Sequence, residues 1–153
     1  MAAKGTRIRS PEDIYSVVSY WARRREENFL AVTLNGAHDV IKVHRITKGL
    51  VNRTIVHPRE CFYPVIKDYA SSVAFVHNHP SGNASPSPED ESVTERLSQA
   101  ACILGFSFLD HVIIAPNGNL FSFRRDGRVQ LNFSKTENRE FIGYLVAEME
   151  GSK

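Results

Sequence analysis

Two histidines and an aspartate, His77, His79 and Asp90, are the residues of this sequence best suited to bind a metal ion. His77 and His79 are two positions apart, so both imidazoles point to the same side of an extended strand. Zinc binds imidazole nitrogen and carboxylate oxygen, and a catalytic zinc site has three protein ligands and a fourth position for water. The three residues therefore predict a hydrolytic zinc centre.

The residues between the second histidine and the aspartate predict how the three side chains meet. Pro80, Ser81 and Gly82 favour a sharp turn directly after His79. Residues 87–90, Ser-Pro-Glu-Asp, are typical of a helix start, with a hydroxyl at the N-cap and proline at the first helical position. The first turn of this helix is therefore expected to lie over the end of the histidine strand.

A purely structural role is the alternative for each of these residues. A bare His-x-His pair is usually structural or solvated. Residues 10–13 repeat the tetrad of residues 87–90 letter for letter, without a nearby histidine, so the tetrad alone indicates only a capped helix. The combination is far more specific. His-x-His-Pro-Ser-Gly with Ser-x-x-Asp at this spacing should occur by chance in fewer than roughly one in a million such chains. Ser87 and Asp90 can cap the helix and serve the site together.

The remaining sequence predicts an α/β or α+β fold with a mixed sheet, because helices and strands are interleaved along the chain. Helices are expected to begin at Ser10-Pro11, Pro58 and Pro88, and the last should end near Leu104, before Gly105. The unbroken apolar run of residues 72–76 is typical of a strand covered on both faces. The expected strands are Phe29–Leu34, Val40–Ile46, Val51–Val56, Ser72–Val76, Phe106–Ala115 and Leu120–Phe123, with a turn at Asn35-Gly36 after the first.

The composition is typical of a soluble globular protein of the cytoplasm. The chain has 153 residues, of which 42% are hydrophobic and 24% charged, and its net charge is +2. No segment approaches the roughly 18 apolar residues of a membrane span, and the N-terminus does not resemble a signal peptide. The two cysteines, Cys61 and Cys102, are fewer than a secreted protein of this size usually has. Both are expected to be buried apolar residues rather than a nucleophile or ligand.

Three segments are expected along the chain. Residues 1–9 form a basic, poorly ordered arm, and residues 10–125 form the folded domain. Residues 126–153 form a C-terminal extension, in which Glu137 to Met149 has an apolar side typical of a helix.

The motif resembles that of a known family. His77-x-His79 followed by Ser87-x-x-Asp90 is similar to the JAMM (MPN+) metalloprotease motif. His-Asn-His-Pro-Ser-Gly at 77–82, with Val-His-Pro-Arg-Glu at 56–60 and Leu-Asp-His at 109–111, resembles the RadC family over roughly residues 26–123. The resemblance implies a JAMM/MPN, cytidine-deaminase-like fold, a mixed sheet flanked by helices with zinc at the end of the central strands. Many RadC proteins also carry an N-terminal helix-hairpin-helix module. This chain is too short for one and is expected to be a short form without it, which weakens the case for a role with DNA.

The resemblance further implies two catalytic residues beside the ligands. Zinc lowers the pKa of a bound water toward ~7, and such a site also needs a proton shuttle that is not a ligand. The JAMM motif places this glutamate on an early strand, where Glu27 is the first choice and Glu26 the alternative. Both acids could instead balance the charges of residues 23–25. Ser87 would hydrogen-bond the oxyanion of the tetrahedral intermediate.

Other polar residues have weaker claims to a functional role. Asp110 or His111 could orient a ligand imidazole, but neighbours on a strand point opposite ways, so at most one can do so. Residues 57–60, His-Pro-Arg-Glu, predict the start of the second helix, with a substrate groove as the alternative. His38 and His44 are expected to be surface residues on strands.

The leading functional hypothesis is a zinc-dependent JAMM-type hydrolase that cleaves a peptide or isopeptide bond in a peptide or protein substrate. Short loops beside the motif give no support to a deubiquitinase. The alternative is a DNA-repair-associated, nucleic-acid-binding module of the RadC type without peptidase activity. It is suggested by the family name and by the basic residues Arg7, Arg9, Arg23–Arg25, Arg124, Arg125 and Arg128. A third hypothesis, a non-catalytic scaffold, fits less well because such domains typically lack the metal ligands. Neither the substrate nor the oligomeric state follows from the sequence.

Overall fold

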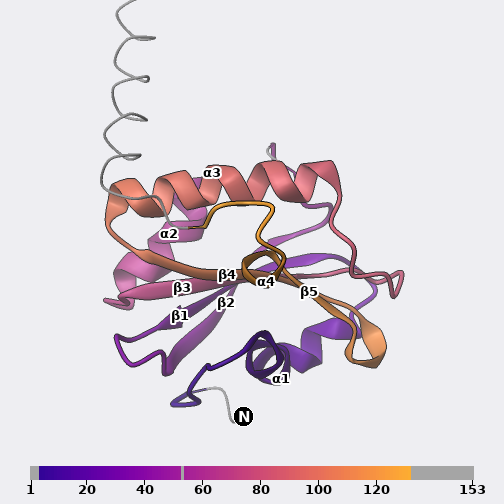
Figure 1. The fold of residues 1–153 in the computed structure, drawn as a ribbon, viewed down its shortest axis with the longest axis horizontal. Coiled ribbons are helices and arrows are strands. Elements are labelled where there is room, and N and C mark those ends of the chain that lie inside the picture. The colour runs from indigo at the N-terminus through magenta and orange to yellow at the C-terminus, as the bar shows by residue number, and fades with distance from the viewer. Residues whose placement is uncertain (1–3, 53, 132–153) are drawn as a thin grey trace, which may run out of the picture.

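A five-stranded mixed sheet forms the middle layer of the protein, with helices on both faces (Figure 1). The computed structural model describes residues 4–52 and 54–131. Helix α1 covers one face of the sheet, and α2 and α3 cover the other (Figure 1). The helices are α1 (Pro11–Ala22), α2 (Pro58–Lys67), α3 (Pro88–Leu104) and the short α4 (Phe123–Asp126). This is the mixed α/β architecture that the sequence predicts.

The strands are β1 (Asn28–Leu34), β2 (Val40–Lys48), β3 (Ser72–Asn78), β4 (Ser107–Ile114) and β5 (Leu120–Ser122). Their order in the sheet is β2-β1-β3-β4-β5, and only β3 and β4 are parallel neighbours. Helix α3 is the crossover between these two strands, as parallel pairing requires. Every residue of β1 and of β3 is buried, which explains the unbroken apolar run at residues 72–76.

The hydrophobic core has two parts, one on each face of the sheet. Phe75 is central to the α2/α3 side, with ring centroids 5.5 Å from Phe29, 5.5 Å from Phe62 and 5.4 Å from Phe108. On the other side, Val76 belongs to the cluster that packs against α1. Side chains of alternate β3 residues therefore pack into the core on opposite faces of the sheet, and this packing holds β3 in place.

The helix boundaries confirm the signals in the sequence. The side chains of Ser10 and Ser87 cap α1 and α3 by accepting hydrogen bonds from Asp13 N and Asp90 N. Helix α2 begins at Pro58, as residues 57–60 predict. Gly105 ends α3 with a φ of 85°, in the left-handed region that favours glycine.

The strand predicted at Val51–Val56 is wrong. The described residues of this segment form turns, because the side-chain oxygen of Asn52 accepts hydrogen bonds from Thr54 N and Ile55 N. An asparagine that closes its own local turn offers the backbone an alternative to sheet pairing. The two valines are nevertheless buried in the core, which accounts for the apolar ends of the segment.

The N-terminal arm is better ordered over its described part, residues 4–9, than the sequence predicts. Gly5 N donates to Val40 O at 2.8 Å, and Val40 N donates to the carbonyl of Thr6 at 2.9 Å. Ile8 is buried against the α1 side of the core. The prediction of a poorly ordered arm is therefore wrong for these residues, since one apolar side chain and a few backbone bonds attach them to the start of β2.

Four smaller predictions need correction or fall outside the described residues. His38 lies in the β1–β2 turn with a φ of 64°, not on a strand. His44 does lie on β2, but it is half-buried and its Nε2 is 2.6 Å from Asp68 Oδ2. Cys61 is buried as predicted, whereas Cys102 is only half-buried. The helix predicted at Glu137–Met149 lies outside the described residues.

The described chain continues to pack beyond residue 125. Val129 and Leu131 are buried on the α3 side of the sheet, and Ser98 Oγ donates to Leu131 O at 2.6 Å. Across residues 4–52 and 54–131, no helix is both long enough and apolar enough to span a membrane.

Candidate metal centre

The three sequence-predicted ligands meet at the carboxyl end of β3. His77 is the next-to-last residue of this strand and is completely buried. His79 follows the strand, and its backbone N–H donates to Ile114 O at 2.8 Å, which ties it to the end of β4. Asp90 lies in the first turn of α3 and is also buried. Sites in open α/β sheets typically lie at the carboxyl ends of the strands, as here.

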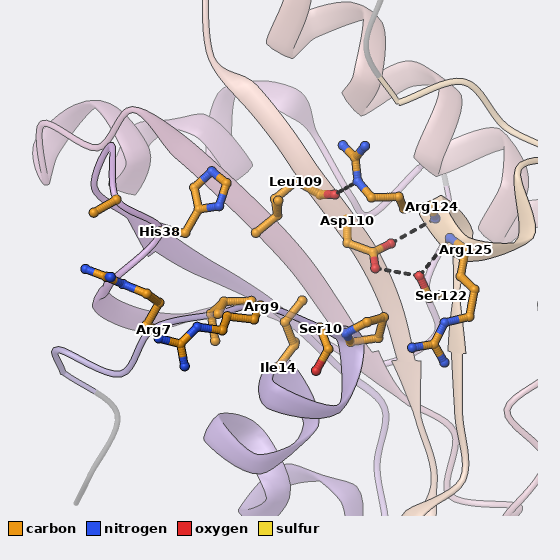
Figure 2. A pocket seen from close by; sticks show the side chains of 13 residues that line it. Arg7, Arg9, Ser10, Ile14, His38, Leu109, Asp110, Ser122, Arg124 and Arg125 are labelled. Atoms are coloured by element: carbon orange, nitrogen blue, oxygen red, sulfur yellow. Dashed lines mark hydrogen bonds between the residues drawn. The ribbon is translucent and has the colours of Figure 1, made fainter.

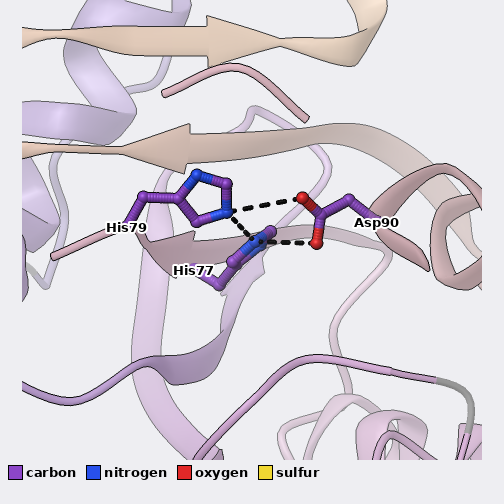
Figure 3. A group of neighbouring side chains, drawn as sticks. All are labelled: His77, His79 and Asp90. Atoms are coloured by element: carbon purple, nitrogen blue, oxygen red, sulfur yellow. Dashed lines mark hydrogen bonds and ion pairs between the residues drawn. The ribbon is translucent and has the colours of Figure 1, made fainter. Parts of the chain in front are cut away.

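The candidate ligand atoms lie close enough to one another to bind a single metal ion (Figure 3). His77 Nε2 is 3.0 Å from His79 Nε2 and 3.1 Å from Asp90 Oδ1. His79 Nε2 is 3.4 Å from Asp90 Oδ2. Zinc with bonds of about 2.0–2.1 Å in a tetrahedral arrangement holds its ligand atoms about 3.4 Å apart. The side chains therefore fit a metal ion of this size with adjustments of only a few tenths of an ångström.

The hydrogen bond at Nδ1 of His79 determines whether Nε2 of the same ring carries a proton or a lone pair. His79 Nδ1 lies 2.9 Å from the carbonyl oxygen of Asn83. A carbonyl can only accept, so the proton of the neutral ring is on Nδ1 and the lone pair of Nε2 faces His77 and Asp90. The loop after His79 thus presents this imidazole in the form that binds a metal.

The electrostatics of the site favour an ionised Asp90. Burial raises the pKa of this carboxyl, but the close polar contacts with His77 and His79 and the hydrogen bond from Ser87 N outweigh it and hold the pKa well below its usual range. For His79, burial lowers the pKa, but hydrogen bonds to Asp90 and Asn83 and the charges of Asp90 and Glu27 outweigh it and raise the pKa. The site thus attracts a positive charge, which a proton or a metal ion can supply.

Glu27 and Glu26 have different partners in the structure. Phe29 pairs directly with His77 across β1 and β3, and Glu27 lies one residue before β1 begins, where its charge raises the pKa of His79. One carboxylate oxygen of Glu27 accepts from Val51 N at 3.1 Å. Glu26 is instead bound to Lys48 at 2.8 Å, with 57% of its side chain exposed. Of the two acids, Glu27 is thus the one whose charge acts on a candidate ligand.

Ser87 is held beside Asp90 by a reciprocal pair of hydrogen bonds. Its hydroxyl oxygen accepts from Asp90 N at 3.1 Å, and Asp90 Oδ2 accepts from Ser87 N at 2.8 Å. Because the hydroxyl is an acceptor here, its own proton is available for another partner. The capping interaction therefore fixes both the carboxylate and the hydroxyl at the start of α3.

Of Asp110 and His111, only His111 contacts the metal centre. His111 Nε2 is 2.9 Å from His77 Nδ1. Asp110 points to the α1 face, where it accepts from Ser122 Oγ at 2.6 Å. Burial raises the pKa of Asp110, whereas burial and the charge of His77 lower that of His111 well below its usual range. The alternation of β4 thus separates the two side chains as predicted.

Among the residues that the structure describes, Thr94 is a side chain of this centre that the sequence analysis missed. It is completely buried, and its Oγ1 lies 2.6 Å from His111 Nδ1. It is four residues after Asp90 on α3, so it follows the carboxylate on the same helix face. This spacing was the only available signal, and it is common in helices.

A cavity of about 520 Å³ lies on the other face of the sheet, beside α1 (Figure 2). Two of the arginines that line it are paired with acids of the same chain: Arg7 binds Asp39 at 2.9 Å and Arg125 binds Glu12 at 2.8 Å. The sheet separates this cavity from His77. These two basic residues, part of the case for nucleic-acid binding, are therefore neutralised locally.

Comparison with known proteins identifies the family to which this fold and centre belong. Residues 8–128 match the family described as the RadC-like JAB domain. The chain belongs to this family. Similar proteins carry the name UPF0758: one from Methanospirillum hungatei is 46% identical over 123 residues, which cover 79% of this chain and 54% of that protein. Another, from Geobacter sulfurreducens, is 42% identical over 118 residues, covering 76% of this chain and 51% of the relative.

A third RadC relative, from Shouchella clausii, is 46% identical over 121 residues, covering 78% of this chain and 52% of its own length. The chain thus spans about half the length of the curated relatives that it matches. Their names state no enzymatic activity. The RadC-like JAB domain is therefore established, together with a His-His-Asp group that could bind a metal.

Proposed function

We propose that this protein is a zinc-dependent hydrolase of the JAMM type, which cleaves a peptide or isopeptide bond with a metal-activated water. One observation carries the proposal: His77, His79 and Asp90 bring two ring nitrogens and a carboxylate within 3.0–3.4 Å of one another. The proton of His79 is directed away from this point, toward Asn83. Lone pairs gathered so closely in a buried site are stabilised by a cation.

The donor set favours zinc among the common metals. Two imidazoles and one carboxylate suit zinc, whereas magnesium and calcium prefer sites made wholly of oxygen. Bound zinc would supply a Lewis acid and lower the pKa of a water molecule. With three protein ligands, a bound zinc would leave a fourth position for that water, and the His79 side chain is partly exposed to solvent.

Two further residues have roles that follow from their positions. The charge of Glu27, just before β1, acts on His79, and Glu27 would take the proton from the attacking water and return it to the leaving amine. The hydrogen bond from Val51 N orients its carboxylate for this role. Ser87 would donate its free proton to the oxyanion that develops on the scissile carbonyl.

Metal analysis of purified variants tests the ligands. Zinc bound per chain should be near stoichiometric in the wild-type protein and in His57→Ala, a histidine control without a side-chain role in its helix cap. His77→Ala, His79→Ala and Asp90→Ala should each lose it. Retention of full occupancy by all three variants would reject the proposed ligands.

The catalytic roles are tested on the zinc-loaded protein with a library of peptides, with cleavage products detected by mass spectrometry. Glu27→Gln should keep the metal and lose turnover by about 10²-fold or more, because general acid–base catalysis typically contributes that much. Glu26→Gln is the matched control and should retain turnover, since Glu26 faces Lys48. Equal activity of the Glu27→Gln protein and the wild type would exclude Glu27 as the base.

A further inference from the structure

A chain of buried side chains connects the backbone of Asp90 to the outer nitrogen of His77. Thr94 Oγ1 lies 2.6 Å from the carbonyl oxygen of Asp90 and 2.6 Å from His111 Nδ1. The other nitrogen of His111, Nε2, lies 2.9 Å from His77 Nδ1. All three side chains are completely buried, so their hydrogen bonds are made with protein groups rather than with solvent.

From this geometry we infer that Thr94 and His111 are positioning residues that fix the proton of His77 on Nδ1 and direct its Nε2 lone pair to the metal. The inference rests on the proposed metal centre and adds two residues to it. It concerns the arrangement of protons in the neutral rings, which exists whether or not a metal is bound.

The direction of the chain follows from its first member. The Asp90 carbonyl can only accept, so the single hydroxyl proton of Thr94 must point to it. The Thr94 oxygen then accepts from His111 Nδ1–H, and the neutral His111 ring has its lone pair on Nε2. That lone pair accepts from His77 Nδ1–H, which leaves Nε2 of His77 as an acceptor.

The reverse direction is unfavourable for the same reason. If His77 carried its proton on Nε2, the hydroxyl of Thr94 would have to donate to His111 Nδ1. Two oxygens, those of Thr94 and of the Asp90 carbonyl, would then lie 2.6 Å apart with no proton between them in a buried site. The carbonyl therefore biases the orientation of the whole chain.

The surroundings hold the His111 ring in the plane that this chain requires. Phe123 stacks on it with a centroid distance of 5.0 Å, and the edge of Phe29 contacts it at 5.6 Å. Partners of this kind behind a ligand histidine typically change metal affinity by about 10–100-fold when they are removed. Since Asp90 and Thr94 are one turn apart, α3 supplies both a ligand and the anchor that orients another ligand.

Nuclear magnetic resonance of ring nitrogens in the metal-free wild-type protein gives the first test, at about pH 8.5, above the ordinary pKa of histidine. His77, His79 and His111 should all carry the proton on Nδ1. A proton on Nε2 of His77 would overturn the inference. This measurement needs no variant, no metal and no activity, so it decides the inference separately from the proposed function.

Zinc affinity, measured by competition with a chromophoric chelator, gives the second test. Thr94→Val should lower the affinity by about 10–100-fold, whereas Thr94→Ser should restore it because the hydroxyl returns. Thr33→Val removes another buried threonine hydroxyl, far from the site, and should leave the affinity unchanged.

The two tests separate the possible failures. Unchanged zinc affinity and an unchanged His77 tautomer in a folded Thr94→Val protein would refute the positioning role of Thr94 and His111. A wild-type protein that shows the expected tautomers but binds no zinc would instead refute the proposed function. The inferred positioning of the His77 proton would still hold.

Discussion

Replacing Asp90 with asparagine should stabilise the metal-free protein, even though it removes a buried carboxylate. In that state, Asp90 faces the ring nitrogens of His77 and His79 at 3.1 and 3.4 Å. The bonds of His79 to Asn83, and of His77 to His111, hold both ring protons on the far sides. An asparagine amide would supply the missing donor while its oxygen still accepts the capping bond at the start of α3.

The size of the effect follows from these contacts. Giving a donor to a buried, unsatisfied acceptor is worth about 1–3 kcal/mol, whereas loss of the charge near the helix N-terminus costs about 0.3–1 kcal/mol. The net gain is roughly 1–2 kcal/mol, or about 2–8 °C in Tm for a domain of this size. Asp90→Ala loses the capping bond without a replacement and should cost about 1 kcal/mol, or about 2–4 °C.

The assay is thermal unfolding followed by circular dichroism, at about pH 8.5 in the presence of a chelator. With zinc at about a hundred times its Kd, the order should reverse, because binding adds about 2.7 kcal/mol to the wild type and little to Asp90→Asn. If both substitutions lower the metal-free Tm equally, a proton lies between a histidine and Asp90, and the reasoning fails.

Three other predictions concern the rest of the fold. Cys61 should resist alkylation until the protein unfolds, because burial raises the pKa of its thiol; early labelling seen by mass spectrometry would contradict this. Gly105→Ala should lower stability in denaturant by about 1–2 kcal/mol because its φ is 85°, whereas Gly36→Ala, without a positive φ, should cost less. Arg125 lowers the pKa of Glu12 to about 2, so the stabilisation from this exposed pair should be present above about pH 4.5 and fade below it as the carboxylate is protonated. In acid titrations of stability, Glu12→Gln should abolish that part of the pH dependence, and an unchanged profile would count against the pair.

The parts of the fold that the sequence predicted are those specified within a few neighbouring residues. Ser10 and Ser87 predict helix starts because an N-cap is a local hydrogen bond between a hydroxyl and the backbone N–H three residues later. The candidate ligands were predictable for a similar reason. His77 and His79 share a side by strand geometry, and the capped helix brings Asp90 back within one short connection.

The parts that the sequence did not predict depend on contacts between distant segments or on competition between local bonds. Residues 51–56 have the apolar ends of a strand, but the Asn52 side chain takes the backbone bonds that a neighbouring strand would need. Thr94 resembles any other helix residue until β4 places His111 against it. Glu27 and Glu26 were separable only once the structure gave each its neighbours, Val51 and His79 for Glu27 and Lys48 for Glu26.

All three candidate ligands come from one continuous stretch, from His77 to Asp90, within a single strand–loop–helix unit. Closing so short a loop costs little chain entropy, so this unit can form early during folding. His111 belongs to β4, which follows α3 in the chain and joins the sheet only after the crossover is made. In a nascent chain, the three ligands could therefore bind a metal ion before His111 is in place to orient His77. Tight metal binding would follow only after β4 has joined the sheet.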